Sequence, residues 1–170
     1  MRSSLEVSYY SESTSMYSAP LPSPNGQIIA VPSGPDSVQQ TTMFYELSPV
    51  GGAPTFLNAV PGRAVGWIDN DHFYTYLMKY NPFPNPGSTY DKTMIYDSHG
   101  NLLATPPIPQ AIDDIDVISS TVIYAPKLGI AYDWTTGAPT WTSPLTTTLS
   151  HATPNRVILS YDHGVYVAPL

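Results

Sequence analysis

The apolar residues of the chain fall in short runs, and Pro, Gly or Asp-Asn turns end almost every run before eight residues. A helix requires apolar positions to recur every three to four residues over a longer stretch, whereas short β-branched or aromatic runs between turns are typical of strands. The pattern therefore predicts an all-β chain with few helices. The expected strands are residues 5–10, 27–31, 42–47, 63–68, 72–78, 92–96, 116–118, 122–125, 129–132, 156–160 and 165–168.

The strands recur in a common order, which is a strand, a tight polar turn, a second strand, and a third strand that ends in an aromatic residue and an acid. The copies open near residues 6, 63, 115 and 156. This spacing is close to the roughly 40–50 residues of a four-stranded propeller blade. We expect about three and a half consecutive antiparallel blades in one domain, with a β-sandwich as the alternative. The blades would span residues 5–61, 62–110, 111–150 and, incompletely, 151–170.

The third copy contains a recognisable motif at residues 131–141, which read AYDWTTGAPTW. This segment resembles the turn of the quinoprotein-like propellers, which are named after pyrroloquinoline-quinone dehydrogenases and include quinone-free scaffolds. The resemblance implies that Asp133 and Thr136 brace the hairpin, that Gly137 takes a tight backbone position, and that Trp141 packs between blades. It is specific over residues 129–141 and loose elsewhere. What it implies is a fold and not a catalytic site.

The charge balance argues against two classes of partner. Six Lys and Arg stand against 13 Asp and Glu, for a net charge of −7, so we expect neither nucleic acid nor an anionic membrane surface as a partner. No apolar run approaches 18 residues, and membrane insertion is not expected. The absence of Cys excludes disulfides, thiolate zinc sites and cysteine nucleophiles. A Lys-poor chain rich in Ser, Thr, Tyr and Pro indicates a secreted or cell-surface bacterial protein whose export signal lies outside this sequence.

Asp113, Asp114 and Asp116 form the densest group of carboxylates. Alternating oxygens can bind Ca²⁺, but a calcium loop also needs a Gly at its sharp turn and a closing Glu, and both are missing here. We therefore interpret the acids as turn residues, keep Ca²⁺ as the weaker alternative, and expect no cofactor.

The aromatic residues are the best candidates for ligand contact, because a ring with a polar edge buries a large area and still forms hydrogen bonds. Residues 80–90 are a Pro-rich insert between two strands, and inserts on a rigid β scaffold often carry recognition. We expect Tyr80, Phe83 and Tyr90 of this insert, together with Trp134 in an exposed turn, to contact a protein or a glycan. Trp67 and Trp141 lie on predicted strands and are expected in the core.

An open series of blades leaves strand edges without partners, and folded proteins avoid this by pairing, covering or closing them. The chain is expected to begin at an inner strand and to end after the second strand of a blade. Two copies would then close a ring of seven blades as a homodimer, or the chain would be part of a longer propeller.

The function expected from these features is that of a non-enzymatic extracellular scaffold or interaction module. The alternative is a secreted carbohydrate-active hydrolase that uses acids such as Asp113, Asp114 or Asp116 at a propeller face. A quinone-dependent dehydrogenase is the weakest candidate, because the chain is too short for that family's full propeller and has no recognisable cofactor site.

Overall fold

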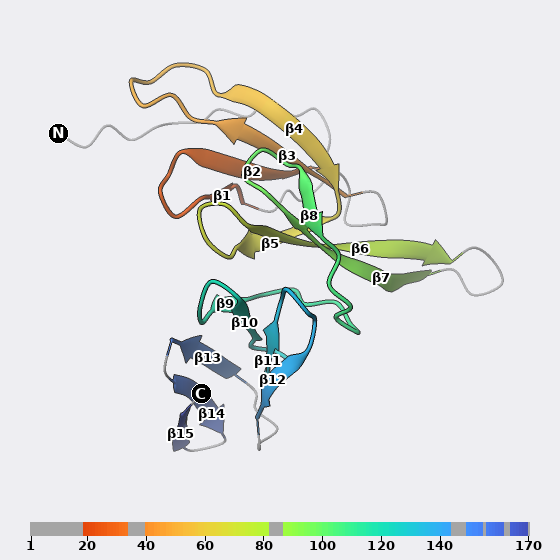
Figure 1. Cartoon of the computed structure of the whole chain (residues 1–170), viewed down its shortest axis with the longest axis vertical. Helices are drawn as coiled ribbons and strands as arrows, with labels where there is room; N and C mark the ends of the chain where they lie inside the picture. Colours follow the sequence, from red (N-terminus) through yellow and green to blue (C-terminus); the bar gives the residue numbers. More distant parts are fainter. Residues whose placement is uncertain are drawn as a thin grey trace.

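The computed structural model describes residues 19–33, 40–81, 87–143, 149–154, 156–161 and 164–169, and within them the chain is all-β (Figure 1). The strands form four antiparallel sheets in chain order. Sheet 1 contains β1 (Leu21–Pro22), β2 (Ile28–Ser33), β3 (Thr41–Glu46) and β4 (Thr55–Pro61). Sheet 2 contains β5 (Arg63–Trp67), β6 (Phe73–Asn81), β7 (Gly87–Tyr96) and β8 (Leu102–Ala104). Sheet 3 contains β9 (Asp116–Val117), β10 (Val122–Ala125), β11 (Ile130–Asp133) and β12 (Pro139–Thr142), and sheet 4 contains β13 (Leu149–Thr153), β14 (Arg156–Tyr161) and β15 (Gly164–Pro169).

The prediction of an all-β chain is confirmed, and each predicted strand from residue 27 onward overlaps an observed one. The predicted strand at residues 5–10 lies outside the described residues. The strands without predicted bounds are β1, β4, β8, β12 and β13, although Trp141 of β12 was expected on a strand, and each is the first or last strand of its sheet. Such strands have one edge without a partner and tolerate Pro, Gly and polar residues, so their composition resembles that of a loop.

The last sheet differs from the expectation. Its predicted opening strand at residues 156–160 is the middle strand, because β13 precedes it and pairs with β14 along its whole length. The described part of sheet 4 therefore has three strands and not two. The signal for β13 was weak because its sequence, LSHAT, is short and half polar.

Three apolar clusters join the sheets, and each contains residues of two sheets that are consecutive in sequence. Phe44 of sheet 1 meets Phe73 of sheet 2 edge to face, with ring centroids 5.2 Å apart. Tyr74 of sheet 2 and Ile123 of sheet 3 belong to the next cluster, and Val157 of sheet 4 joins the last. The four sheets thus pack face against face in an open series that runs down Figure 1.

Each inner sheet uses both faces for this packing, because successive residues of a strand point to opposite faces. Phe73 and Tyr74 are adjacent on β6, yet Phe73 packs on sheet 1 and Tyr74 packs on sheet 3, and both are fully buried. Ile123 and Tyr124 on β10 divide in the same way between sheets 2 and 4. We call the face toward the preceding sheet the trailing face and the face toward the following sheet the leading face.

The turn at residues 133–137 is braced by Asp133, although the hydroxyl that bonds its carboxylate belongs to Thr135, while the Thr136 hydroxyl accepts a hydrogen bond from the Ala138 amide at 3.3 Å. The Asp133 carboxylate accepts hydrogen bonds from the Thr135 amide at 2.8 Å and the Thr135 hydroxyl at 2.6 Å. The Thr135 hydroxyl bond is the main reason that the pKa of Asp133 is lowered. Gly137 has a φ of 74°, in the left-handed region, and a Cβ there would lie 2.7 Å from Pro107 Cδ in the segment after sheet 2. Trp141 is half-buried against the third cluster.

The turn between β7 and β8 repeats this arrangement one sheet earlier. Asp97 accepts hydrogen bonds from the amides of His99 and Asn101, both at 2.8 Å. Gly100 has a φ of 78°, and its carbonyl accepts a hydrogen bond from the Asn58 side chain of sheet 1 at 3.0 Å. In both sheets, the turn between the third and fourth strands therefore contacts the segment that precedes its own sheet.

None of the described residues forms a helix that is long and apolar enough to cross a membrane.

Candidate functional site

The insert predicted at residues 80–90 belongs to a long hairpin made by β6 and β7. β5 pairs with residues 73–76 of β6, and β8 pairs only with Ile95 and Tyr96 of β7. Beyond these residues, the two strands of the hairpin pair only with each other among the described residues. The hairpin extends to the right of the sheets in Figure 1, beyond the strands that flank its base.

The sequence-predicted aromatic residues of this hairpin have different environments. Tyr80 is 52% exposed near the end of β6. Tyr90 is half-buried, and its hydroxyl donates a hydrogen bond to the Ile108 carbonyl at 2.7 Å, so it attaches the hairpin to the segment after sheet 2. Burial raises the pKa of Tyr90. Phe83 lies outside the described residues. Of the two predicted contact residues that are described in this hairpin, Tyr80 is the more exposed.

A small pocket of about 90 Å³ lies at the base of the hairpin, where β5 begins and the free edge of β6 continues. Tyr76, Met78 and Tyr80 alternate onto one face of β6, so the exposed ring follows two residues that line this pocket. The lining residues are Gln40, Gly62, Arg63, Tyr76, Leu77, Met78 and Ser88. This pocket could not be predicted from the sequence, because its lining residues come from four separate segments of the chain.

Positive charge gathers around this hairpin although the chain as a whole is acidic. Arg63, Lys79 and Lys92 are three of the chain's six cationic side chains, and all three are exposed here. Asp91 is also exposed on β7 and offsets one of them. This local excess could have been noticed in the sequence, where Lys79 and Lys92 flank the insert and Arg63 opens the neighbouring strand.

Asp113 is held beside this pocket by two partners. Its carboxylate accepts a 2.6 Å hydrogen bond from the Tyr76 hydroxyl and lies 3.6 Å from the Lys127 ammonium. Burial, together with the adjacent Asp113 charge, raises the pKa of Tyr76 to about 12, while Arg63 acts in the opposite direction. Tyr76 is therefore a neutral hydrogen-bond donor at physiological pH.

The acids at 113, 114 and 116 do not converge. Asp116 accepts a 2.7 Å hydrogen bond from the Ala152 amide of sheet 4, at a different junction from Asp113. Asp114 is exposed between them. Across the described ranges, no group of three or more His, Asp and Glu side chains is arranged to hold a metal ion.

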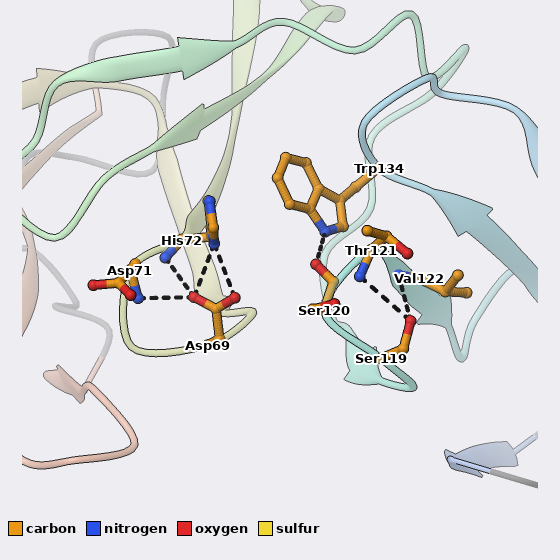
Figure 2. Close-up of polar contacts among 8 residues, drawn as sticks. All are labelled: Asp69, Asp71, His72, Ser119, Ser120, Thr121, Val122 and Trp134. Atoms are coloured by element: carbon orange, nitrogen blue, oxygen red, sulfur yellow. Dashed lines mark hydrogen bonds and ion pairs between the residues drawn. The ribbon is translucent and has the colours of Figure 1, made fainter.

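The expectation that Trp134 is exposed is wrong. Its side chain is 7% exposed and belongs to the cluster between sheets 2 and 3. Figure 2 shows the indole between the two sheets, where its Nε1 donates a 2.9 Å hydrogen bond to the Ser120 carbonyl. Its ring centroid lies 4.9 Å from that of His72, whose Nδ1 is 2.8 Å from the Asp69 carboxylate. The polar neighbours of Trp134 in sequence suggested solvent, but the ring turns back onto the preceding sheet.

The structure therefore brings Tyr80 and Tyr90 onto one hairpin and places Trp134 in another sheet as a packing residue. In comparisons with protein-family models and with curated proteins, no match to this chain was found.

Proposed function

We propose that the four sheets are consecutive blades of a β-propeller-type scaffold and that the chain is a non-enzymatic extracellular interaction module. Two observations support blades over a β-sandwich. A sandwich packs two sheets face to face, whereas here both sheet 2 and sheet 3 bury two faces in a series. The bracing of the turn by Asp133 also agrees with the resemblance to quinoprotein-like blades. The secreted or cell-surface location rests on composition.

The recognition element in this proposal is the β6–β7 hairpin, and one observation carries it. The hairpin extends from the scaffold with strand edges along which no further described strand pairs, an exposed Tyr80, and a pocket at its base. An exposed strand edge binds an extended peptide by adding it as a further strand, and adjacent pockets then select its side chains. The cations Arg63, Lys79 and Lys92 favour an acidic segment. The ligand proposed is therefore an extended acidic segment of a partner protein.

The hydrolase alternative is not carried forward. A glycosidase needs two carboxylates that face each other across a cleft at about 5–9.5 Å. Asp113 is engaged by Tyr76 and Lys127, and Asp116 by the Ala152 amide. These contacts give both acids a structural role. A glycan ligand for the hairpin remains as the second arm of the binding experiment.

The test compares wild-type protein with Tyr80→Ala and Arg63→Gln on an array of extended peptides of graded acidity, with a glycan array in parallel. Leu102→Ala is the matched control, because Leu102 is 55% exposed, against 52% for Tyr80, and lies on β8 away from the hairpin. We expect acidic peptides to bind, to weaken about tenfold or more in both hairpin variants, and to bind less tightly at high salt. Binding that is equal in all four proteins would refute the hairpin assignment, and binding to glycans alone would replace the peptide ligand.

A further inference from the structure

The leading face of sheet 4 presents exposed apolar side chains, and on β14 the same face also carries Arg156 and Ser160, on either side of Ile158. Ile158 pairs with Val167 across β14 and β15, and Val165 lies on the same face two residues earlier. Their side chains are 42%, 50% and 71% exposed, respectively. The opposite face of this sheet is covered, since Val157 is fully buried against sheet 3.

The same face is buried in the preceding sheets. The residues of sheet 2 at equivalent places on its second and third strands are Tyr74 and Ile95, and both are fully buried against sheet 3. Sheet 1 likewise buries Ala30 and Phe44 completely against sheet 2. The exposed Ile158, Val165 and Val167 of sheet 4 thus lie at the positions that, in sheets 1 and 2, pack against the following sheet.

Sheet 1 has the complementary feature on its trailing face. Tyr45 and Phe56 pair across β3 and β4 with ring centroids 5.6 Å apart, and Phe56 is 55% exposed. Ile29, Val31 and Met43 lie on the same face and are only half-buried. The equivalent residues of sheet 2, Phe73 among them, are buried against the sheet before it. The first and last described sheets therefore expose one apolar face each, and the two faces are of opposite kinds.

The pattern of packing within the chain indicates what covers these two faces, because each junction between described sheets joins a leading face to a trailing face. The free leading face of sheet 4 requires a trailing face, and the free trailing face of this chain is on sheet 1. Residues on both faces remain exposed, so the two faces do not cover each other within one copy. A second copy supplies both missing partners by continuing the junctions that already hold the sheets together.

We propose that two copies associate head to tail, with sheet 4 of each packed on sheet 1 of the other. The two junctions are identical and related by a twofold axis, and together they close a ring. The described residues of each chain contribute four sheets, so a ring built from these sheets has eight and not the seven expected from three and a half blades. This inference rests on the proposed packing of blades in series but does not depend on the ligand of the hairpin.

The experiment is sedimentation velocity over a dilution series with the whole chain. The wild-type protein should have twice the 18.5 kDa mass of one chain. Val167→Glu on the leading face of sheet 4 and Phe56→Glu on the trailing face of sheet 1 should each shift the protein toward monomer by at least tenfold in dissociation constant. Val50→Glu, at an exposed position in the β3–β4 turn, should remain dimeric.

Mixing the two disrupted variants gives the decisive result. A Phe56→Glu chain retains an intact sheet 4 and a Val167→Glu chain retains an intact sheet 1. The mixture should therefore form dimers through this one intact junction, and it should do so more tightly than either variant alone. This association also demonstrates that both variants are folded. A wild-type monomer at every concentration would overturn the proposal, as would a dimer that Phe56→Glu leaves intact. Masses that grow beyond two copies would overturn the closed ring.

The two proposals fail separately. A monomer that still binds acidic peptides through its hairpin would remove the ring and leave the interaction module. A dimer that binds no peptide and no glycan on either array would leave the ring and remove the interaction module.

Discussion

Two glycine-to-alanine substitutions isolate the contribution of the close contact at Gly137. Gly137 and Gly26 have almost the same left-handed backbone, with φ values of 74° and 70°. They differ in the space around a new methyl group. A Cβ at position 26 meets nothing within 4 Å, whereas one at position 137 would lie 2.7 Å from Pro107 Cδ, 2.9 Å from its N and 3.0 Å from its C.

The expected costs follow from this difference. The left-handed conformation costs a residue with a Cβ about 1–2 kcal/mol, and this term applies to both variants. Replacing Gly also restricts the unfolded chain, which offsets about 0.4–1 kcal/mol in both. At position 137 the methyl group would also displace backbone atoms of Pro107, which adds about 1–3 kcal/mol, as other overpacked sites do. The free energy of unfolding of Gly137→Ala should therefore be lower than that of Gly26→Ala by about 1–3 kcal/mol.

Urea unfolding followed by intrinsic tryptophan fluorescence measures this difference directly. In a thermal scan, the midpoint of Gly137→Ala should lie below that of Gly26→Ala by about 2–4 °C for each kcal/mol. Equal losses in the two variants would show that the turn does not press on Pro107, and would refute the packing of this turn against the segment that follows sheet 2.

Three further changes test other contacts. Trp134→Phe removes the donor to the Ser120 carbonyl at a buried junction and should cost about 1–3 kcal/mol of unfolding free energy, measured in urea. Because the pKa of Tyr76 is raised to about 12, its neutral form stabilises the fold fully below about pH 10, and this contribution is lost as the pH rises toward 12. Tyr76→Phe should therefore lose less stability than the wild type between pH 10 and 12. The pKa of Asp133 is lowered, mainly by the hydrogen bond from the Thr135 hydroxyl. Its ionised carboxylate therefore stabilises the fold above about pH 4, and this stabilisation is lost on acidification. Asp133→Asn should accordingly flatten the acid limb of the stability profile.

Each of these predictions has an outcome that contradicts it. An unchanged urea midpoint for Trp134→Phe, with Leu102→Phe as the exposed control, would argue against the buried hydrogen bond. Parallel alkaline profiles for the wild type and Tyr76→Phe would mean that this hydroxyl titrates as it does in the unfolded chain. An acid limb of unchanged slope in Asp133→Asn would exclude its carboxylate as the titrating group.

The sequence predicted the central strands of each sheet well, because β-branched and aromatic runs between turns reflect local backbone preference and burial together. It missed edge strands such as β4 and β8, where one edge has no partner and the composition resembles that of a loop. It misplaced Trp134 because the polarity of residues 133–136 describes the turn and not the direction of the ring. The pocket beside Arg63 could not be predicted, since its lining residues come together only after sheets 1 and 2 pack.

The repetition of one kind of junction also bears on how such a chain can change over generations. Duplicating about 40–50 codons would add one sheet whose two faces match those already present. The remaining contacts would be undisturbed, since stability in serial architectures is close to a sum over neighbouring units. In the ring that we propose, the number of sheets would then follow the number of times this segment is repeated in the gene, and one duplication would give a wider ring.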